Sequence, residues 1–226
     1  MNDSKSIIKD LKKYHNPKNI EGMKRFGIGG KNVLGGPSIP VSRSMAKKIG
    51  KDHVIARELW DSEIHEARIL AGFIDDPKLV TEKQMNLWVN DFDSWDICDL
   101  VCSSLFDKTA YAKKMLLLWV KDDKEFVKRA GFVMMAALAV HDNVMKDEDF
   151  EKYFPIIKKY SVDERNFVKK AVNWALRQIG KRNKRLNIKA INTAKDILKI
   201  NSKSARWIAN NAIIELTSTS VKNRLR

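Results

Sequence analysis

The stretch Phe167-Val168-Lys169-Lys170-Ala171-Val172-Asn173-Trp174-Ala175-Leu176-Arg177 decides the fold class of this chain. Its apolar residues recur at helical spacing, and no segment shows the strict alternation and turn chemistry of a β-strand. The same period continues through most of the sequence. It predicts helices at residues 4–14, 17–26, 40–49, 53–60, 63–74, 81–91, 94–105, 109–120, 124–141, 147–160, 164–180, 187–199 and 203–216.

The connections between these helices are mostly short, which favours antiparallel neighbours. Many such helices in a row predict an all-α solenoid of antiparallel helix pairs with a concave face for a long partner. An irregular helical bundle remains open, because no strict sequence period is visible. We treat residues 1–226 as one domain, in which 1–45 hold the N-terminal helices and a glycine-rich loop and 46–226 hold the repeats. Capping boxes are expected where Thr81 precedes Gln84, Asp122 precedes Glu125 and Ser161 precedes Glu164.

The composition describes a folded protein that does not enter a membrane. The 226 residues are 44% hydrophobic, and no run approaches the roughly 18 apolar residues of a membrane span. The first ten residues lack the apolar core of a secretion signal. The two cysteines, Cys98 and Cys102, predict buried thiols and neither a disulfide framework nor a metal site. We therefore expect a cytoplasmic, nucleoid-associated monomer without metal or cofactor.

The net charge of +15 is concentrated at the two ends of the chain. Residues 1–51 carry +9, residues 177–226 carry +11, and the segment between them carries −5. Such basic ends suit binding to a polyanion, although lysine-rich solvated helix faces are the alternative.

The glycine-rich loop from Gly27 to Pro40 is similar to a phosphate-binding loop only in part. Arg25 stands where the first glycine of such a loop belongs, and Asn32 follows Lys31 where serine or threonine is required. No predicted strand precedes it. We therefore interpret the loop as a flexible surface segment.

Trp95 and Asp99 are four residues apart in a predicted helix, so the indole and the carboxylate share one face. Tryptophans are usually core residues and helical aspartates are usually solvated, so this spacing alone does not define a site.

A family resemblance sharpens the hypothesis. The sequence resembles the AlkD-type DNA alkylation repair glycosylases from about residue 55 to the C-terminus, in five ordered blocks. The blocks are Arg57-Glu58-Leu59-Trp60-Asp61 with Glu66-Ala67, Ser94-Trp95-Asp96-Ile97-Cys98-Asp99, Phe126-Val127-Lys128-Arg129-Ala130, Phe167 to Arg177, and Ser202-Lys203-Ser204-Ala205-Arg206.

The resemblance implies HEAT-like helix pairs curved around duplex DNA, with a basic concave face. It implies site residues at Trp95, Asp99, Arg129 and Trp174. Two departures stand out. Ser94 occupies a position where the family often has a second tryptophan, and residues 1–45 do not match clearly.

The function expected from these observations is base excision repair of alkylated duplex DNA. Release of 3-methyladenine or 7-methylguanine needs a negative charge near the sugar, which Asp99 can supply. Trp95 and Trp174 would form an aromatic wall, and Arg129 would hold a phosphate. Further DNA contacts are predicted for Lys128, Lys170, Arg177, Lys181, Arg182, Lys184, Lys203 and Arg206. A non-catalytic protein that binds damaged or structured DNA is the alternative, and a protein-binding scaffold is disfavoured by the charge.

Overall fold

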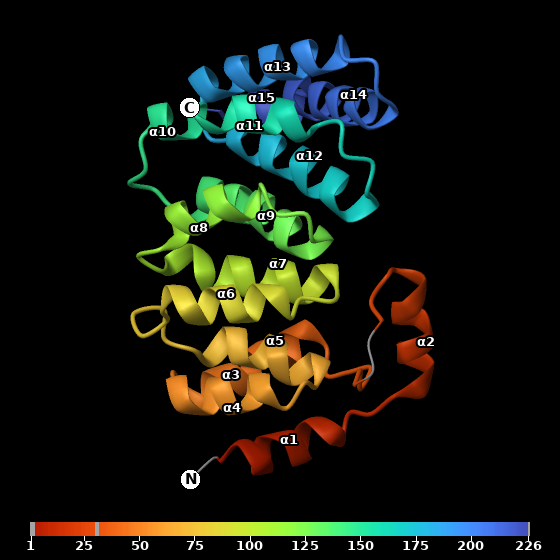
Figure 1. Cartoon of the computed structure of the whole chain (residues 1–226), viewed down its shortest axis with the longest axis vertical. Coiled ribbons are helices and arrows are strands. Elements are labelled where there is room, and N and C mark those ends of the chain that lie inside the picture. Colours follow the sequence, from red (N-terminus) through yellow and green to blue (C-terminus); the bar gives the residue numbers. More distant parts are fainter. Residues whose placement is uncertain (1–2, 30–31, 226) are drawn as a thin grey trace. The chain divides into compact units, whose positions relative to one another are not determined.

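The computed structural model describes residues 3–29 and 32–225, which form helices joined mostly by short connections (Figure 1). These described residues contain no β-strand, as the sequence predicts. The chain divides into two compact units, Met1–Lys113 (unit 1) and Lys114–Arg226 (unit 2). Among the described helices, none combines the length and apolar character that a membrane crossing requires.

Unit 1 is built around a buried central helix, α5. The element order is α1 (Ser4–Lys12), α2 (Pro17–Arg25), α3 (Ile39–Ile49), α4 (His53–Asp61), α5 (His65–Ile74), α6 (Glu82–Asn90), α7 (Trp95–Ser104) and the short 3₁₀ helix η1 (Phe106–Lys108). Helix α5 packs against α3, α4 and α7. The Trp60 ring of α4 stacks on Trp88 of α6 with centroids 4.0 Å apart, and its indole N–H donates to Asp91. The large tryptophans 60 and 88 are therefore core residues.

Unit 2 is built around two long helices, α9 and α12. Its elements are α8 (Ala112–Trp119), which crosses the unit boundary, α9 (Glu125–His141), α10 (Asp147–Glu151), α11 (Tyr153–Tyr160), α12 (Asn166–Gly180), α13 (Lys184–Leu198), α14 (Lys203–Thr217) and α15 (Thr219–Lys222). Helix α12 packs against α9, α13 and α14. Gly131 of α9 permits close packing, because a β-carbon there would come within 2.6 Å of Val120.

Polar contacts between neighbouring helices join residues that are 31 to 41 positions apart in the sequence. In unit 2 the Arg129 side chain bonds the Phe167 carbonyl 38 residues on, and the Ser204 hydroxyl bonds the Asp163 carbonyl 41 residues back. In unit 1 the corresponding separation is 31 residues, between Trp60 and Asp91. The residues that make these contacts are of different types, and two of the three acceptors are backbone carbonyls. The structural repeat is therefore not visible as a sequence repeat.

Most predicted helices lie close to the observed ones, although α8 begins three residues later than predicted and the short η1 and α15 were not predicted. Two further differences concern unit 2. The segment predicted at 147–160 is broken at Lys152 into α10 and α11. Helix α13 begins three residues earlier than predicted, because the Asn183 side chain caps it by accepting from the Leu186 N–H at 2.9 Å.

The predicted caps fare unevenly. The Thr81 hydroxyl accepts from the Gln84 N–H as expected. The prediction at Asp122 is wrong, because its carboxylate accepts from the Lys124 N–H and the helix begins only at Glu125. The prediction at Ser161 is also wrong. Its hydroxyl donates to the Lys158 carbonyl, three residues back at the end of α11. This local bond replaces the expected cap on the next helix.

Candidate nucleic-acid site

Trp95 and Asp99 lie on α7, one helical turn apart, and both are half-buried. Trp95 is the first residue of the helix, and its indole N–H donates to the Phe26 carbonyl at 2.9 Å. This bond ties the first turn of α7 to the segment after α2, although the two are 69 residues apart in sequence. The thiols of Cys98 and Cys102 on the same helix are buried, which confirms their expected place in the core.

A cleft of about 890 Å³ opens beside Trp95. Its walls come from the end of α1 and the α1–α2 connection, from α2, from the loop before α3, and from the first residues of α5 and α7. The residues that carry the arguments below are Tyr14, Lys18, Gly22, Arg25, Phe26 and Trp95. The cleft lies wholly within unit 1, and the sequence analysis did not predict it.

Two acidic side chains at the cleft are committed to internal partners. The Asp96 carboxylate lies 2.9 Å from Nε2 of His65. Burial disfavours the imidazolium, but the bond and charge of Asp96 outweigh it and raise the pKa of His65. Burial likewise acts against ionisation of Asp96, yet His65 lowers the pKa of that carboxyl. Both effects favour a charged pair that joins α5 to α7.

The second carboxylate, Glu66, organises the glycine-rich loop. Glu66 is 3% exposed and accepts hydrogen bonds from the backbone N–H groups of Leu34, Gly35 and Gly36 at 2.8 to 3.3 Å. Gly35 has a positive φ of 81°, and a β-carbon there would lie 2.4 Å from the Asn16 carbonyl.

The prediction of a flexible surface loop is therefore wrong for residues 32–36. Glu66 holds their backbone N–H groups on one side, and Gly35 packs closely against the Asn16 carbonyl on the other. Lys31 lies outside the described residues. The backbone N–H groups of Leu34, Gly35 and Gly36 already bind a protein carboxylate, so these three donors are not available to a phosphate.

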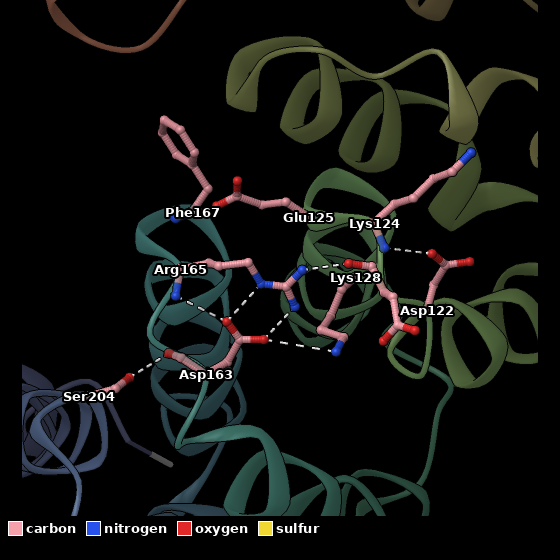
Figure 2. Close-up of polar contacts among 9 residues, drawn as sticks. Asp122, Lys124, Glu125, Lys128, Asp163, Arg165, Phe167 and Ser204 are labelled. Atoms are coloured by element: carbon pink, nitrogen blue, oxygen red, sulfur yellow. Dashed lines mark hydrogen bonds and ion pairs between the residues drawn. The ribbon is translucent and has the colours of Figure 1, made fainter.

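In unit 2 the first turns of α9, α12 and α14 are linked by a polar network (Figure 2). The Asp163 carboxylate accepts from Arg165 through its backbone N–H, Nε and Nη2, at 3.1, 3.0 and 2.5 Å. Arg165 also donates to the Asp123 carbonyl, and the Asp163 carbonyl accepts from Ser204. Burial works against the charge of Asp163, but Arg165 holds the pKa of that carboxyl below its usual range. The network links three helix N-termini, and the partial positive charge of a helix N-terminus suits an anion.

Arg129 and Trp174 occupy different settings within unit 2. Arg129 is 5% exposed, and its Nη1 donates to the Phe167 carbonyl at 2.6 Å, so it joins α9 to the start of α12. Trp174 is half-buried on α12. Unit 1 thus carries the predicted pair Trp95 and Asp99, and unit 2 carries Arg129 and Trp174.

The cations predicted to contact DNA fall into three groups. Lys128 and Arg182 make internal contacts: Lys128 lies 3.8 Å from Asp163, and Arg182 donates to the carbonyls of Ala139 and Asp142. A second pair shares one partner on α14, since Arg177 and Lys181 both bind Glu215. The remaining four are exposed: Lys170, Lys184, Lys203 and Arg206.

Sequence reasoning missed His65, Phe26 and the role of Glu66. A signal for Glu66 was present, because Glu66-Ala67 belongs to the first block of the family resemblance. No local pattern marks Phe26, whose importance follows from a contact with the distant Trp95.

The fold and these residues define a HEAT-like helical-repeat protein. A solved structure described as "A new family of proteins related to the HEAT-like repeat DNA glycosylases with affinity for branched DNA structures" shares the fold with a TM-score of 0.82. The two chains are 20% identical, and the match covers 99% of this chain and 96% of that chain.

The chain belongs to the DNA alkylation repair enzyme family, whose sequence model matches residues 7–216. The family assignment made from the sequence is therefore confirmed. The match also begins within α1, so most of the N-terminal segment that showed no clear resemblance is part of the family pattern. No curated protein matches the chain.

Proposed function

We propose that the protein is a DNA glycosylase that releases cationic N3- and N7-alkylated purines from duplex DNA. The observation that carries the proposal is the placement of Trp95 and Asp99 one turn apart on α7, both half-buried, with Trp95 on the wall of an open cleft. Membership of a family described as DNA alkylation repair enzymes supports the same chemistry.

Asp99 is the residue to which the proposal assigns the chemical step. Alkylation at N3 or N7 makes the base cationic and already a good leaving group, so no strong general acid is needed. As the glycosidic bond breaks, positive charge develops on the deoxyribose, and a nearby carboxylate stabilises it and orients the attacking water. Trp95 contributes an aromatic face, to which a cationic base is attracted by roughly 0.5–2 kcal/mol.

Phosphate contacts are assigned to unit 2. The linked N-termini of α9, α12 and α14 supply positive dipole ends, and Lys170, Lys203 and Arg206 are exposed in the first two turns of α12 and α14. Lys184 adds an exposed cation at the start of α13. By resemblance, Arg129 would contact the phosphate beside the lesion, and Trp174 would complete the aromatic wall.

A second candidate is a protein that binds branched DNA without cleaving a glycosidic bond. Two observations favour it. Arg129 is 5% exposed and uses one end of its guanidinium on the Phe167 carbonyl, which restricts a phosphate grip. The similar solved structure is also described as having affinity for branched DNA.

One assay separates the two candidates. Purified protein is incubated with methylated duplex DNA, and released 3-methyladenine and 7-methylguanine are quantified by chromatography. Base release above the spontaneous rate supports the glycosylase, and its abolition in Asp99→Asn assigns the release to this protein. If neither base is released while branched DNA is bound, the second candidate replaces the first.

A further inference from the structure

We propose that the cleft between α2 and the first turns of α5 and α7 binds one unpaired nucleotide of DNA, with its base against the aromatic walls and its phosphate on the basic rim. The proposal rests on the DNA-binding part of the proposed function. It does not require glycosidic bond cleavage.

The size and lining of the cleft suit a nucleotide. Its volume of about 890 Å³ falls in the range of roughly 300–1,000 Å³ that small-molecule sites occupy. The exposed lining surface is mainly apolar, and its polar groups come from α2 and from the first turns of α5 and α7. Such a site buries a planar, weakly polar ring more readily than a chain of charged or extended groups.

Three aromatic side chains surround the opening. Phe26 is 72% exposed and Tyr14 is 44% exposed, so both rings are accessible to a base in the cleft. Trp95 stands opposite α2, and its orientation is fixed by the bond to the Phe26 carbonyl. Stacking on such rings contributes about 1–3 kcal/mol per base and accepts any base, because every base has a π-face.

The charges at the rim select a nucleotide over an uncharged apolar ligand. Helix α2 presents Lys18 and Arg25 at the cleft, while its acidic residue, Glu21, is paired with Lys24 at 2.8 Å. Glu21 also lines the cleft, but its ion pair with Lys24 leaves Lys18 and Arg25 as the cations that a phosphate attached to a stacked base would meet. An unpaired nucleotide supplies both parts in one residue of the strand.

The walls can adapt to an occupant without loss of core packing. Helix α2 has no fully buried residue, and three described hydrogen bonds tie it and its N-cap to the rest of unit 1: from the Asn16 N–H to the Leu34 carbonyl, from Asn19 to the Gly35 carbonyl, and from Trp95 to the Phe26 carbonyl. Gly22 lines the cleft on α2, and a β-carbon there would meet nothing within 4 Å. A larger side chain at this position would enter the cleft and not the core.

Gly22 offers the sharpest test. Dissociation constants are measured by fluorescence anisotropy for two unmethylated DNAs of equal length, a matched duplex and a duplex with one unpaired nucleotide. We expect wild type and Gly22→Ala to bind the second DNA at least about tenfold more tightly, which is about 1.4 kcal/mol. Gly22→Leu should reduce the preference to within about twofold and leave the affinity for matched duplex unchanged.

Phe26→Ala tests the aromatic wall, with Val54→Ala as its control, since Val54 is a 64% exposed apolar residue of unit 1 outside the cleft. The unpaired nucleotide carries 2-aminopurine, whose fluorescence is quenched by stacking. Quenching on binding to wild type and Val54→Ala, with less quenching for Phe26→Ala, supports the proposal. Equal affinity for both DNAs in wild type, or no effect of Gly22→Leu, overturns it.

The outcome is independent of catalysis. A protein that releases methylated bases but shows no preference for an unpaired nucleotide refutes the cleft proposal alone. A preference without base release refutes the glycosylase alone. Failure to bind either DNA refutes both.

Discussion

Units 1 and 2 are similar in length but differ sharply in charge. Unit 1 has 18 Lys and Arg against 16 Asp and Glu, a net charge of +2, whereas unit 2 has 25 against 12, a net charge of +13. Unit 1 instead holds the cleft, the pair Trp95 and Asp99, and two buried carboxylate contacts. The proposed function therefore assigns attraction of the DNA backbone to unit 2 and action on the nucleotide to unit 1.

Fewer cations of unit 2 are available to a partner than its net charge of +13 suggests. Arg182 and Arg165 bind backbone carbonyls of other helices, and Lys181 shares Glu215 with Arg177. A count of basic residues in a segment therefore measures long-range attraction. Which of them contact a phosphate depends on what each side chain already binds.

The largest expected effect concerns salt. If unit 2 neutralises about five phosphates, the logarithm of duplex affinity should fall against the logarithm of salt with a slope of about −4 to −5. Affinity would then drop by roughly 250- to 1,000-fold between 50 and 200 mM salt, measured by anisotropy of a labelled undamaged duplex. Replacing Lys203 by Gln should reduce the slope by about one. Salt-independent binding would remove the electrostatic role of unit 2.

The next effect tests whether unit 1 carries the chemistry. Asp99→Asn keeps the shape of the side chain and removes the negative charge that the cationic sugar needs. We expect a single-turnover rate lower by at least ~100-fold, about 2.7 kcal/mol, with DNA binding unchanged or improved. Rates are followed by release of 7-methylguanine under enzyme excess. Equal rates for wild type and variant would exclude Asp99 from the mechanism.

Asp96→Asn is the matched comparison on the same helix. Because Asp96 is paired with His65, its loss should lower the melting temperature and leave the chemical step intact. A selective loss of rate in Asp96→Asn, without loss of stability, would transfer the catalytic assignment to this residue.

A third prediction concerns a cation that unit 2 uses internally. Arg182 binds the carbonyls of Ala139 and Asp142, and its guanidinium lies 4.3 Å from the centroid of the Phe150 ring. Arg182→Met should therefore cost about 1.5–3 kcal/mol of unfolding free energy, as expected for hydrogen bonds of a charged group. Lys184→Gln, two residues on and exposed, should change stability by less than about 0.5 kcal/mol and weaken DNA binding. Chemical denaturation measures both, and equal stability of the two variants would contradict the assignment.

Arg129→Lys tests whether the buried Arg129 of unit 2 also contributes to base release, in addition to its contact with the Phe167 carbonyl. Lysine keeps the charge but loses the planar fork that can bind the Phe167 carbonyl and a phosphate together. We expect base release slower by about tenfold, or about 1.4 kcal/mol, with a melting temperature near that of wild type. If the variant unfolds at a much lower temperature, Arg129 is a structural residue only.

The smallest expected effect is a pH dependence confined to unit 1. The raised pKa of His65 means that its pair with Asp96 stabilises the fold fully below about pH 6.5, the ordinary value for histidine. This stabilisation is lost as the pH rises through the higher folded pKa. The lowered pKa of Asp96 means that the contribution of this carboxylate is present above its unfolded pKa and lost in acid.

The melting temperature should consequently fall between pH 6 and pH 8, and His65→Gln should reduce that fall. Calorimetry at a series of pH values measures it. The same pH dependence in wild type and His65→Gln would contradict a stabilising charged pair.

The fold was predictable from the sequence because helical periodicity is a local property. The stretch around Trp174 and the Thr81 cap could be interpreted from residues three or four apart. The cleft could not, since it depends on contacts such as Trp95 with Phe26 and Glu66 with Leu34, which are 69 and 32 residues apart. The internal use of Arg182 was missed for the same reason, because its partners are backbone carbonyls that carry no sequence signature.

The hydrogen bonds of Glu66 also determine which truncated forms of the protein can be stable. A fragment that starts near residue 46 would retain α4 to α15, but it would lose most of α3 and the backbone N–H groups that bind the buried Glu66 carboxylate. Removing the partners of a buried charge costs about 3–5 kcal/mol, a large share of the stability of a typical domain. Residues 34–36 are therefore an integral part of the fold of unit 1, and shortening the protein to residues 46–226 would yield an unstable fragment.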